Sequence, residues 1–185
     1  MAETSAEGQL LIVGCGNPLR GDDGVGLVIA RALRRRLGSA ATVCEHRGAG
    51  TALLDLWQGA HAIILVDAAE SGVPPGDYAR FDAVAAPLPA NLRSCSTHAF
   101  GVAAAVELGR TLNILPATLI VYAVYGEEFA YGMGLSRNAK RAARHAIAAI
   151  MRESERILTS RSLVEATQRA VSGCSAAQPT RCQTS

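Results

Sequence analysis

Short apolar runs alternate along the chain with longer stretches in which apolar residues recur at every third or fourth position. A short unbroken apolar run predicts a buried strand, and the wider spacing predicts a helix with one buried face. The expected strands are residues 10–13, 42–45, 62–66 and 118–124, with 78–81 as an additional edge strand. The expected helices are residues 25–37, 52–57 and 102–112, and a long helix that begins after Ser136.

The order of these elements predicts the arrangement of the strands. Strands that alternate with helices form a mostly parallel sheet, because each helix crosses one face of the sheet before the next strand begins. We therefore expect an α/β fold with one domain, a doubly wound, mostly parallel sheet of about five strands with helices on both faces. The domain is expected to span residues 9–158, after a flexible N-terminus at residues 1–8. Residues 159–185 are polar and aperiodic, which predicts a tail without fixed structure.

Several helix ends carry recognisable end signals. Gly38 follows the first long helix, where a glycine commonly terminates one. Ser136 is a credible N-cap for the last helix. One of Asp22 and Asp23 is expected to cap the helix that begins near Gly24, because aspartate interacts favourably with a helix N-terminus.

Composition narrows the class of protein. Of the 185 residues 49% are hydrophobic and only 4% are aromatic, which favours a core of small aliphatic side chains. The net charge of +2 gives no argument for nucleic acid or an anionic membrane as a partner. No apolar run is long enough to span a bilayer, and the polar, acidic start does not resemble a secretory signal. Five scattered cysteines without a CxxC pair favour reduced thiols, so we expect a cytoplasmic protein.

The candidate chemistry gathers at one edge of the expected sheet. In a doubly wound sheet, ligands bind beyond the carboxyl ends of the strands. Residues 14–23 follow the first expected strand, residues 47–51 follow the second, and Asp67 ends the third. His98 lies just before a helix that leads to the next strand. Four segments that are distant in sequence are therefore expected to meet at one rim.

The glycine-rich segment "GCGNPLRGDDGVG" does not fit a nucleotide site. Leu19 occupies the third glycine position of the G-x-G-x-x-G fingerprint, and the chain has no G-x-x-x-x-G-K-[ST] loop. Asp22 and Asp23 would also place carboxylates where a phosphate should lie, and these like charges would repel.

Two carboxylates and an imidazole at the rim suggest a metal. Asp23, Asp67 and His98 would form a partial shell for a borderline divalent ion such as nickel or zinc, with open positions. An ion held in this way can accept ligands from a partner or lower the pKa of a water molecule. A catalytic pair formed by the Cys95 thiol and the His98 imidazole remains a weaker alternative. The chain has no G-x-S-x-G or H-E-x-x-H motif.

The motifs taken together resemble one family. "LIVGCGNPLRGDDGVG", "ILVDAA", "STHAFG" and "VYGEEFAYGMGLS" occur in the order and at about the spacing of the hydrogenase maturation endopeptidases. The resemblance implies an aspartyl-type endopeptidase that removes the C-terminal extension of a nickel–iron hydrogenase large-subunit precursor. It implies that Asp23, Asp67 and His98 contact the nickel that the precursor carries, and that the protein has no organic cofactor. A monomer is expected.

The resemblance also implies a loop surface that meets the substrate. The expected contact residues are Gly16, Asn17, Asp22, Gly48, Gly50 and Thr51. One departure concerns "EHRGAGT", where His46 and Arg47 replace the acid and the first glycine that many relatives carry. Glu45 would compensate for the missing acid if the register shifted.

Other functions remain as alternatives or are excluded. A non-catalytic nickel-checking or chaperone module for the same subunit, and a general metallohydrolase that holds its own zinc, both remain open. Peptidyl-tRNA hydrolases also begin with a strand and a G-x-G-N-P-G turn. This chain has Leu19 instead of that last glycine, and its net charge is only +2 whereas RNA binding normally requires a basic footprint, so we exclude them.

Overall fold

The computed structural model describes residues 10–47, 50–70, 74–90, 92–94, 101–132 and 134–174. Its strands are β1 (Leu10–Cys15), β2 (Thr42–His46), β3 (Ala62–Glu70), β4 (Tyr78–Asp82), β5 (Arg93–Ser94) and β6 (Thr118–Tyr125). Its helices are α1 (Val25–Leu37), α2 (Thr51–Leu56), α3 (Val102–Thr111) and α4 (Arg137–Cys174), with short 3-10 turns at Gly21–Gly24 (η1) and Gly38–Ala40 (η2).

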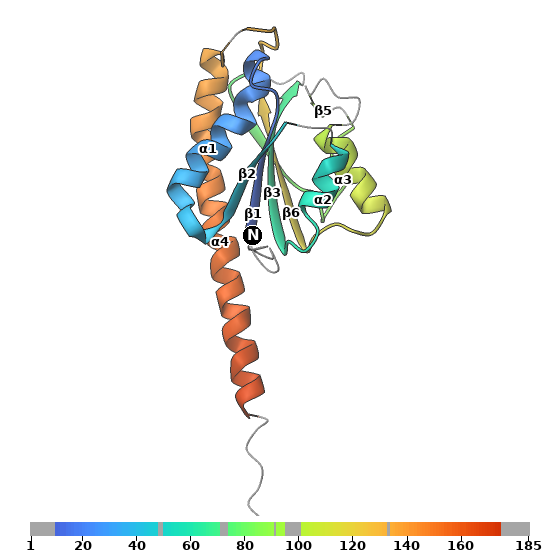
Figure 1. Cartoon of the computed structure of the whole chain (residues 1–185), viewed down its shortest axis with the longest axis vertical. Coiled ribbons are helices and arrows are strands. Elements are labelled where there is room, and N and C mark those ends of the chain that lie inside the picture. The colour runs from blue at the N-terminus through green and yellow to red at the C-terminus, as the bar shows by residue number, and fades with distance from the viewer. Residues whose placement is uncertain are drawn as a thin grey trace, which may run out of the picture.

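These strands form one sheet in the order β2-β1-β3-β6-β4, and β5 pairs with β3 beside that path (Figure 1). Strands β2, β1, β3 and β6 run parallel to one another, whereas β4 is antiparallel to β6 and β5 is antiparallel to β3. The predicted fold class is therefore confirmed, including the additional edge strand.

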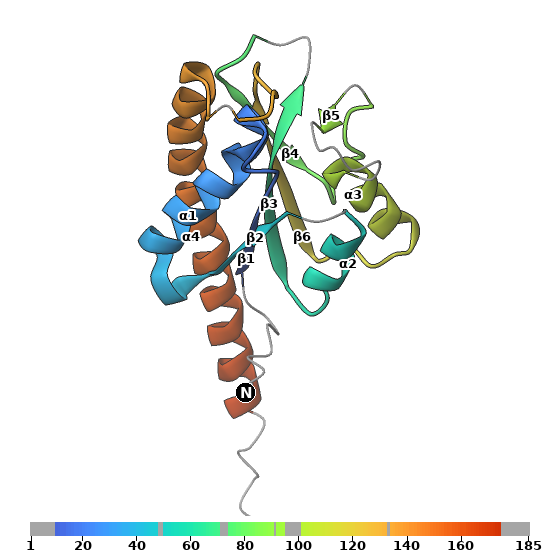
Figure 2. The same cartoon turned by 45° about the horizontal axis from the view of Figure 1, so that its top comes forward.

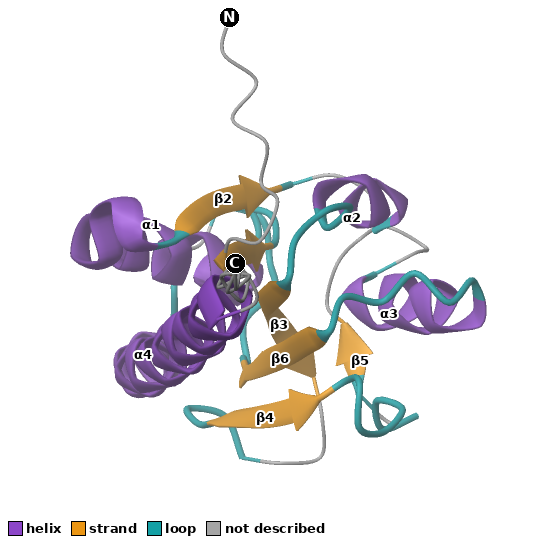
Figure 3. Cartoon of the chain, turned by 90° about the horizontal axis from the view of Figure 1, so that it is seen from below, coloured by secondary structure: helices purple, strands orange, loops and turns teal. Residues whose placement is uncertain are grey.

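Helices cover both faces of the sheet (Figure 3). The long helices α1 and α4 pack against each other and against one face, and α2 and α3 lie together on the other. Each side has its own core. The α1/α4 face contains Ile12, Ile64, Tyr122 and the small residues of α4, and the α2/α3 face contains Leu65, Trp57 and Val106.

The helix that begins after Ser136 follows its expected pattern at its start. Ser136 Oγ accepts a hydrogen bond from the N–H of Ala139 at 3.0 Å, which confirms the predicted N-cap. One side of the helix is buried along Ala139, Ala143, Ala146, Ile147 and Ile150.

The C-terminal boundary of this helix is a correction. We expected a tail without fixed structure from residue 159, but α4 continues to Cys174 (Figure 1). Residues 159–172 contain no proline or glycine, and adding residues to an existing helix costs far less than starting one. Ile157 and Leu158 still pack against the core, whereas Leu163 and Val164 are exposed. Within the described residues, no helix is both long and apolar enough to cross a membrane.

Strand β3 is also longer than expected. Residues 62–66 were predicted as the strand, with Asp67 at its end, but β3 continues to Glu70. The extra residues pair with β6 and β5, which are distant in sequence, and Asp67 lies opposite Ala123 of β6. Asp67 is therefore inside β3, just beyond the point where pairing with the shorter β1 ends.

Candidate functional site

The carboxyl ends of three parallel strands form the rim on which the candidate site is built (Figure 2). Cys15 of β1 lies opposite His46 of β2, and Gly14 lies opposite Val66 of β3. Continuing this register by one residue places Asp67 beside Cys15. Parallel partners project to the same face of a sheet, so Cys15 and Asp67 share the α2/α3 face.

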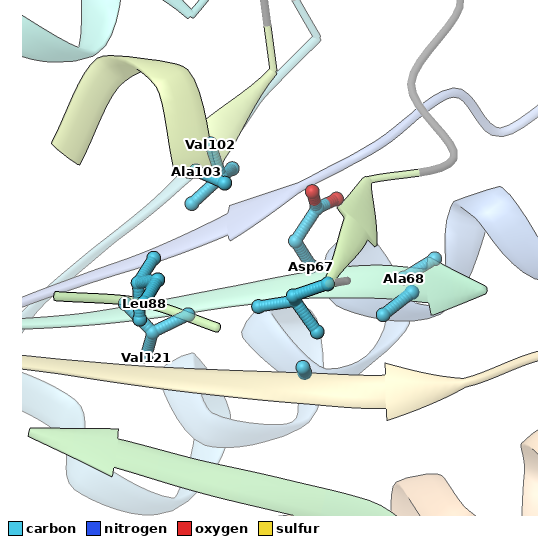
Figure 4. A pocket seen from close by; sticks show the side chains of 9 residues that line it. Asp67, Ala68, Leu88, Val102, Ala103 and Val121 are labelled. Carbon is cyan, nitrogen blue, oxygen red and sulfur yellow. The ribbon is translucent and has the colours of Figure 1, made fainter. Parts of the chain in front are cut away.

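Asp67 is only 5% exposed and lines a pocket on that face. In Figure 4 its carboxylate rises from β3 on the side where Val102 and Ala103 begin α3. Among the described residues, the others that line the pocket are all apolar: Ala68, Ala69, Leu88, Leu92, Val102, Ala103, Val121 and Ala123. The pocket thus places one carboxylate in apolar surroundings at the start of a helix.

Asp23 approaches the same region from η1, which packs against β3. Its side chain is fully buried, and Nη1 of Arg20 lies 3.9 Å from its Oδ2. Burial raises the pKa of the Cys15 thiol well above its ordinary value, and the negative charges of Asp67 and, more weakly, Asp23 raise it further. Both carboxylates therefore act electrostatically on one buried thiol. The structure brings the two predicted acids to the same part of the rim.

Several glycines of this segment leave no room for a side chain, and two of them set how it lies against the strands. Gly16 has φ +134°, and a Cβ there would collide with the carbonyl oxygen of Asp23. A Cβ on Gly26 would collide with the carbonyl oxygens of Cys15 and Val66. The first turn of α1 can therefore rest on the ends of β1 and β3 only because residue 26 has no side chain.

Asp22 points to a different place from Asp23. Its Oδ2 accepts hydrogen bonds from the N–H groups of Glu127 and Glu128 at 2.9 and 3.1 Å, and its Oδ1 accepts one from Ser136 at 2.7 Å. The side chain is fully buried. Asp22 therefore joins η1 to the segment between β6 and α4.

The expected aspartate cap on α1 is wrong. The N-cap position is Gly24, which has no side chain, and no side-chain cap bond is made there. The 3-10 turn moves both aspartates back from the start of α1. One carboxylate is directed to the β6–α4 segment, and the other is close to β3.

The other predicted site residues have separate positions. Asn17 accepts a hydrogen bond from the N–H of Leu19 at 2.9 Å and so stabilises its own turn. Gly50 is the N-cap of α2 and Thr51 is its first residue, exposed to solvent. The predictions for His98, Gly48 and Cys95 lie outside the described residues. Within the described residues, no three His, Cys, Asp or Glu side chains form a group that could hold a metal ion.

Glu45 does not replace the acid expected after β2. Its carboxylate lies 2.8 Å from Arg31, 3.0 Å from Arg47 and 3.6 Å from Arg34. The hydrogen bond from Arg31, aided by Arg47, lowers the pKa of Glu45 from its ordinary 4.5 to about 2. Glu45 is directed to α1, on the opposite side of the sheet from Asp67.

Sequence reasoning missed two residues of the site. Arg20 lies one helical turn before Asp23 and stacks over Tyr131, with its guanidinium carbon 5.7 Å from the ring centroid. Its spacing of three residues from Asp23 was the available signal. Cys15 was counted only as one thiol among five, although its position as the last residue of β1 placed it at the rim.

Comparison with known proteins identifies the family. The sequence profile of the HycI family, described as hydrogenase maturation protease, matches residues 28–153, well over half of the chain. The chain belongs to the hydrogenase maturation protease family. The matched region contains Asp67 and begins after Asp22 and Asp23.

Curated members of this family are distant relatives. HoxM of Cupriavidus necator, a hydrogenase expression/formation protein, is 28% identical over 141 residues, which cover 75% of this chain and 70% of HoxM. HupD of Thiocapsa roseopersicina is 27% identical over 118 residues, covering 63% of this chain. The aligned region is 53% of HupD, so the chain spans about half the length of that relative.

Solved structures of hydrogenase maturation proteases share the fold. The hydrogenase maturating endopeptidase HybD from Escherichia coli superposes with a TM-score of 0.66 at 25% identity, covering 79% of this chain and 93% of HybD. HybD from Thermococcus kodakarensis gives a TM-score of 0.62 at 24% identity, covering 79% and 99%. The α/β architecture is thus the one found in other hydrogenase maturation proteases.

Proposed function

We propose that the protein is an endopeptidase that removes the C-terminal extension from the large-subunit precursor of a nickel–iron hydrogenase. The nickel already inserted in the precursor is the recognition element, and Asp23 and Asp67 contact it, with His98 as the third ligand. The observation that carries this proposal is that two acids from separate segments are buried at one rim of a chain of this family, where the η1 turn that carries Asp23 packs against β3, which carries Asp67.

The chemistry of the residues fits this substrate. Carboxylate oxygens together with imidazole nitrogen suit a borderline divalent ion, and a partial shell leaves room for the ligands that the precursor supplies. The ion belongs to the substrate, so the enzyme needs to bind it only while the precursor is present. The precursor is then cut only when its metal has been loaded.

The residues around the two acids set their positions. Gly16 and Gly26 let the η1 segment lie close to the ends of β1 and β3, which fixes Asp23 beside the strand that carries Asp67. Arg20 places a positive charge 3.9 Å from Asp23, which offsets part of the cost of burying that carboxylate. The apolar pocket around Asp67 excludes water from one side of that carboxylate and strengthens its interaction with a cation. A water molecule activated at this site would attack the scissile carbonyl.

The test is cleavage of the precursor with and without nickel. The purified protein is incubated with each form of the precursor, and the mass of the large subunit is measured over time. We expect a loss of mass only with nickel-loaded precursor, and no cleavage by the Asp67→Asn and Asp23→Asn variants. Asp55→Asn is the matched control, since Asp55 is an exposed acid of α2 away from the rim.

The alternative functions give different results in the same test. Equal cleavage of nickel-free precursor would contradict the role of nickel. Binding of the precursor without any cleavage by the unaltered protein would indicate a nickel-checking module. Stoichiometric zinc in the purified protein, with cleavage that stops when the zinc is removed, would indicate a general metallohydrolase.

A further inference from the structure

The first half of α4 has an exposed, strongly basic face. Between residues 137 and 152 the helix contains no acid. Its cations are all exposed: Arg137, Lys140, Arg141, Arg144 and Arg152. Arg137, Lys140, Arg141 and Arg144 are related by spacings of three and four residues that place them along one side of the helix, and Arg152 follows eight residues after Arg144. We call these five residues the α4 basic face.

This arrangement is unfavourable for the helix itself. The N-terminus of a helix carries partial positive charge, which repels cations in its first turns. The first turn of α4 contains no acidic residue. Arg137 and Arg141, like Lys140 and Arg144, are also like-charged pairs with a spacing of four residues, which destabilise a helix. Helix stability therefore does not explain these cations.

A second basic run in the molecule shows the opposite placement. Arg34, Arg35 and Arg36 lie in the last turn of α1, where the helix dipole favours cations. Arg34 is bound to Glu45 and donates to the carbonyl oxygen of Val43. The run on α1 thus has a structural reason that the α4 basic face lacks.

The acids near the α4 basic face are engaged elsewhere. Within the described residues, no carboxylate forms an ion pair with any of its five cations, although other ion pairs of the molecule are well formed. Glu153 is bound to Arg80, and Glu127 accepts hydrogen bonds from Asn138. The charge of the face is therefore available to a partner.

A recess adjoins this face. It has a volume of about 360 Å³ and lies between α4 and the turn before β4, lined by Pro74, Pro75, Gly76, Asp77, Arg141 and His145. Nε of Arg141 donates to the carbonyl oxygen of Gly76 at 3.4 Å. A Cβ at Gly76, where φ is +98°, would collide with the guanidinium of Arg141. The absence of a side chain at Gly76 thus lets Arg141 lie across the turn.

The face is continuous with the candidate site. The N–H of Ser136, directly before α4, is bound to Asp22, and Asp22 is adjacent to Asp23. The α4 basic face therefore begins one residue beyond a direct contact with the η1 segment and extends away from the rim along the helix (Figure 2).

We propose that the α4 basic face docks an acidic surface of the hydrogenase precursor, outside the segment that is cleaved. This proposal rests on the proposed function. A protein surface fits better than nucleic acid or a membrane for two reasons. Residues 137–152 contain no phenylalanine, tyrosine or tryptophan that could stack on bases, and none of their large apolar side chains is exposed for insertion into lipid. The recess, which combines proline surface with a guanidinium and a carboxylate, fits a polypeptide side chain.

The test compares two double variants that each remove two exposed cations. Lys140→Gln/Arg144→Gln alters the α4 basic face, and Arg35→Gln/Arg36→Gln is the matched control on α1. KM and kcat for precursor cleavage are measured at several salt concentrations. We expect the α4 variant to raise KM about 10-fold at low salt with unchanged kcat, and to make kcat/KM less dependent on salt. The α1 variant should behave like the unaltered protein.

A binding measurement without cleavage separates this proposal from the proposed function. The intact precursor is titrated with each protein on ice, and complex formation is followed by fluorescence anisotropy. If the unaltered protein cleaves no precursor, the proposed function is overturned. Docking is still supported in that case if the α4 variant binds the precursor more weakly and the α1 variant does not. Equal binding by the two double variants overturns docking. Docking is also overturned if the α4 variant binds the precursor as well as the unaltered protein does but no longer binds duplex DNA or vesicles containing phosphatidylserine.

Discussion

The acids on the two faces of the central sheet have different surroundings. On the α1/α4 side, Asp22 accepts three backbone hydrogen bonds, and Glu153 forms a two-point ion pair with Arg80 at 2.8 and 3.0 Å. On the α2/α3 side, Asp67 faces a pocket whose other described lining residues are apolar. The hydrogen-bonded carboxylates of Asp22 and Glu153 join separate segments of the fold, whereas the carboxylate of Asp67 is directed to a pocket.

This difference separates residues that maintain the fold from those available for chemistry. A buried acid that faces a pocket is a better functional candidate than one that joins two segments of the fold. Asp22 and Asp23 are neighbours in the same motif, yet Asp22 is bonded to the β6–α4 segment and Asp23 lies close to β3. Four measurements test whether these acids differ in this way.

The largest effect is expected at Asp67. The Asp67→Asn variant should lower the rate of precursor cleavage about 1000-fold, because the carboxylate is placed in the reaction itself. Its free energy of unfolding should change far less than the cleavage rate, because asparagine keeps the size of aspartate and one oxygen acceptor. Urea denaturation and the cleavage assay on the same preparation measure both quantities. A large loss of stability would place Asp67 with the structural acids.

Asp22 should show the opposite behaviour. The Asp22→Ala variant leaves three N–H groups of the β6–α4 segment without their acceptor, and it should lose about 3 kcal/mol in free energy of unfolding. Urea denaturation measures this loss, and Asp55→Ala, at an exposed position, should stay within about 0.5 kcal/mol of the unaltered protein. A comparably small change at Asp22 would show that these bonds contribute little.

Glu153 should have an intermediate effect. Glu153→Gln removes the ion pair with Arg80, whose side chain is 40% exposed, and we expect a loss of about 1 kcal/mol. The control is Glu155→Gln, since Glu155 is exposed two residues further along α4. The two midpoints of thermal unfolding provide the comparison, and coincident midpoints would contradict a stabilising ion pair.

The smallest effect is expected at Glu45 and depends on pH. Its pKa is about 2 in the folded protein and near 4.5 when the contacts with arginine are lost. A lowered pKa contributes stability that is fully present above about pH 4.5 and is lost as the pH falls toward 2. The difference in unfolding free energy between the unaltered protein and Glu45→Gln should therefore shrink across this range. A difference that is constant with pH would exclude the contribution.

The alternation of apolar runs predicted most of the fold because it depends on local sequence. The same reasoning placed Asp23 and Asp67 at one rim, since parallel strands end together. Features that depend on distant pairing were not predictable: β3 extends past Asp67 because of β6 and β5, and the partners of Asp22 lie more than 100 residues away. Nothing near Asp22 in sequence indicates where its carboxylate points.

The three bonds of Asp22 also couple two distant parts of the molecule mechanically. A ligand that displaces Asp23 would also displace the adjacent Asp22, which is bonded to the amide that precedes α4. The near end of the long helix is anchored beside the rim in this way, and its far end projects beyond the sheet (Figure 1). A fluorophore attached near residue 163 would register occupancy at the rim from many turns away.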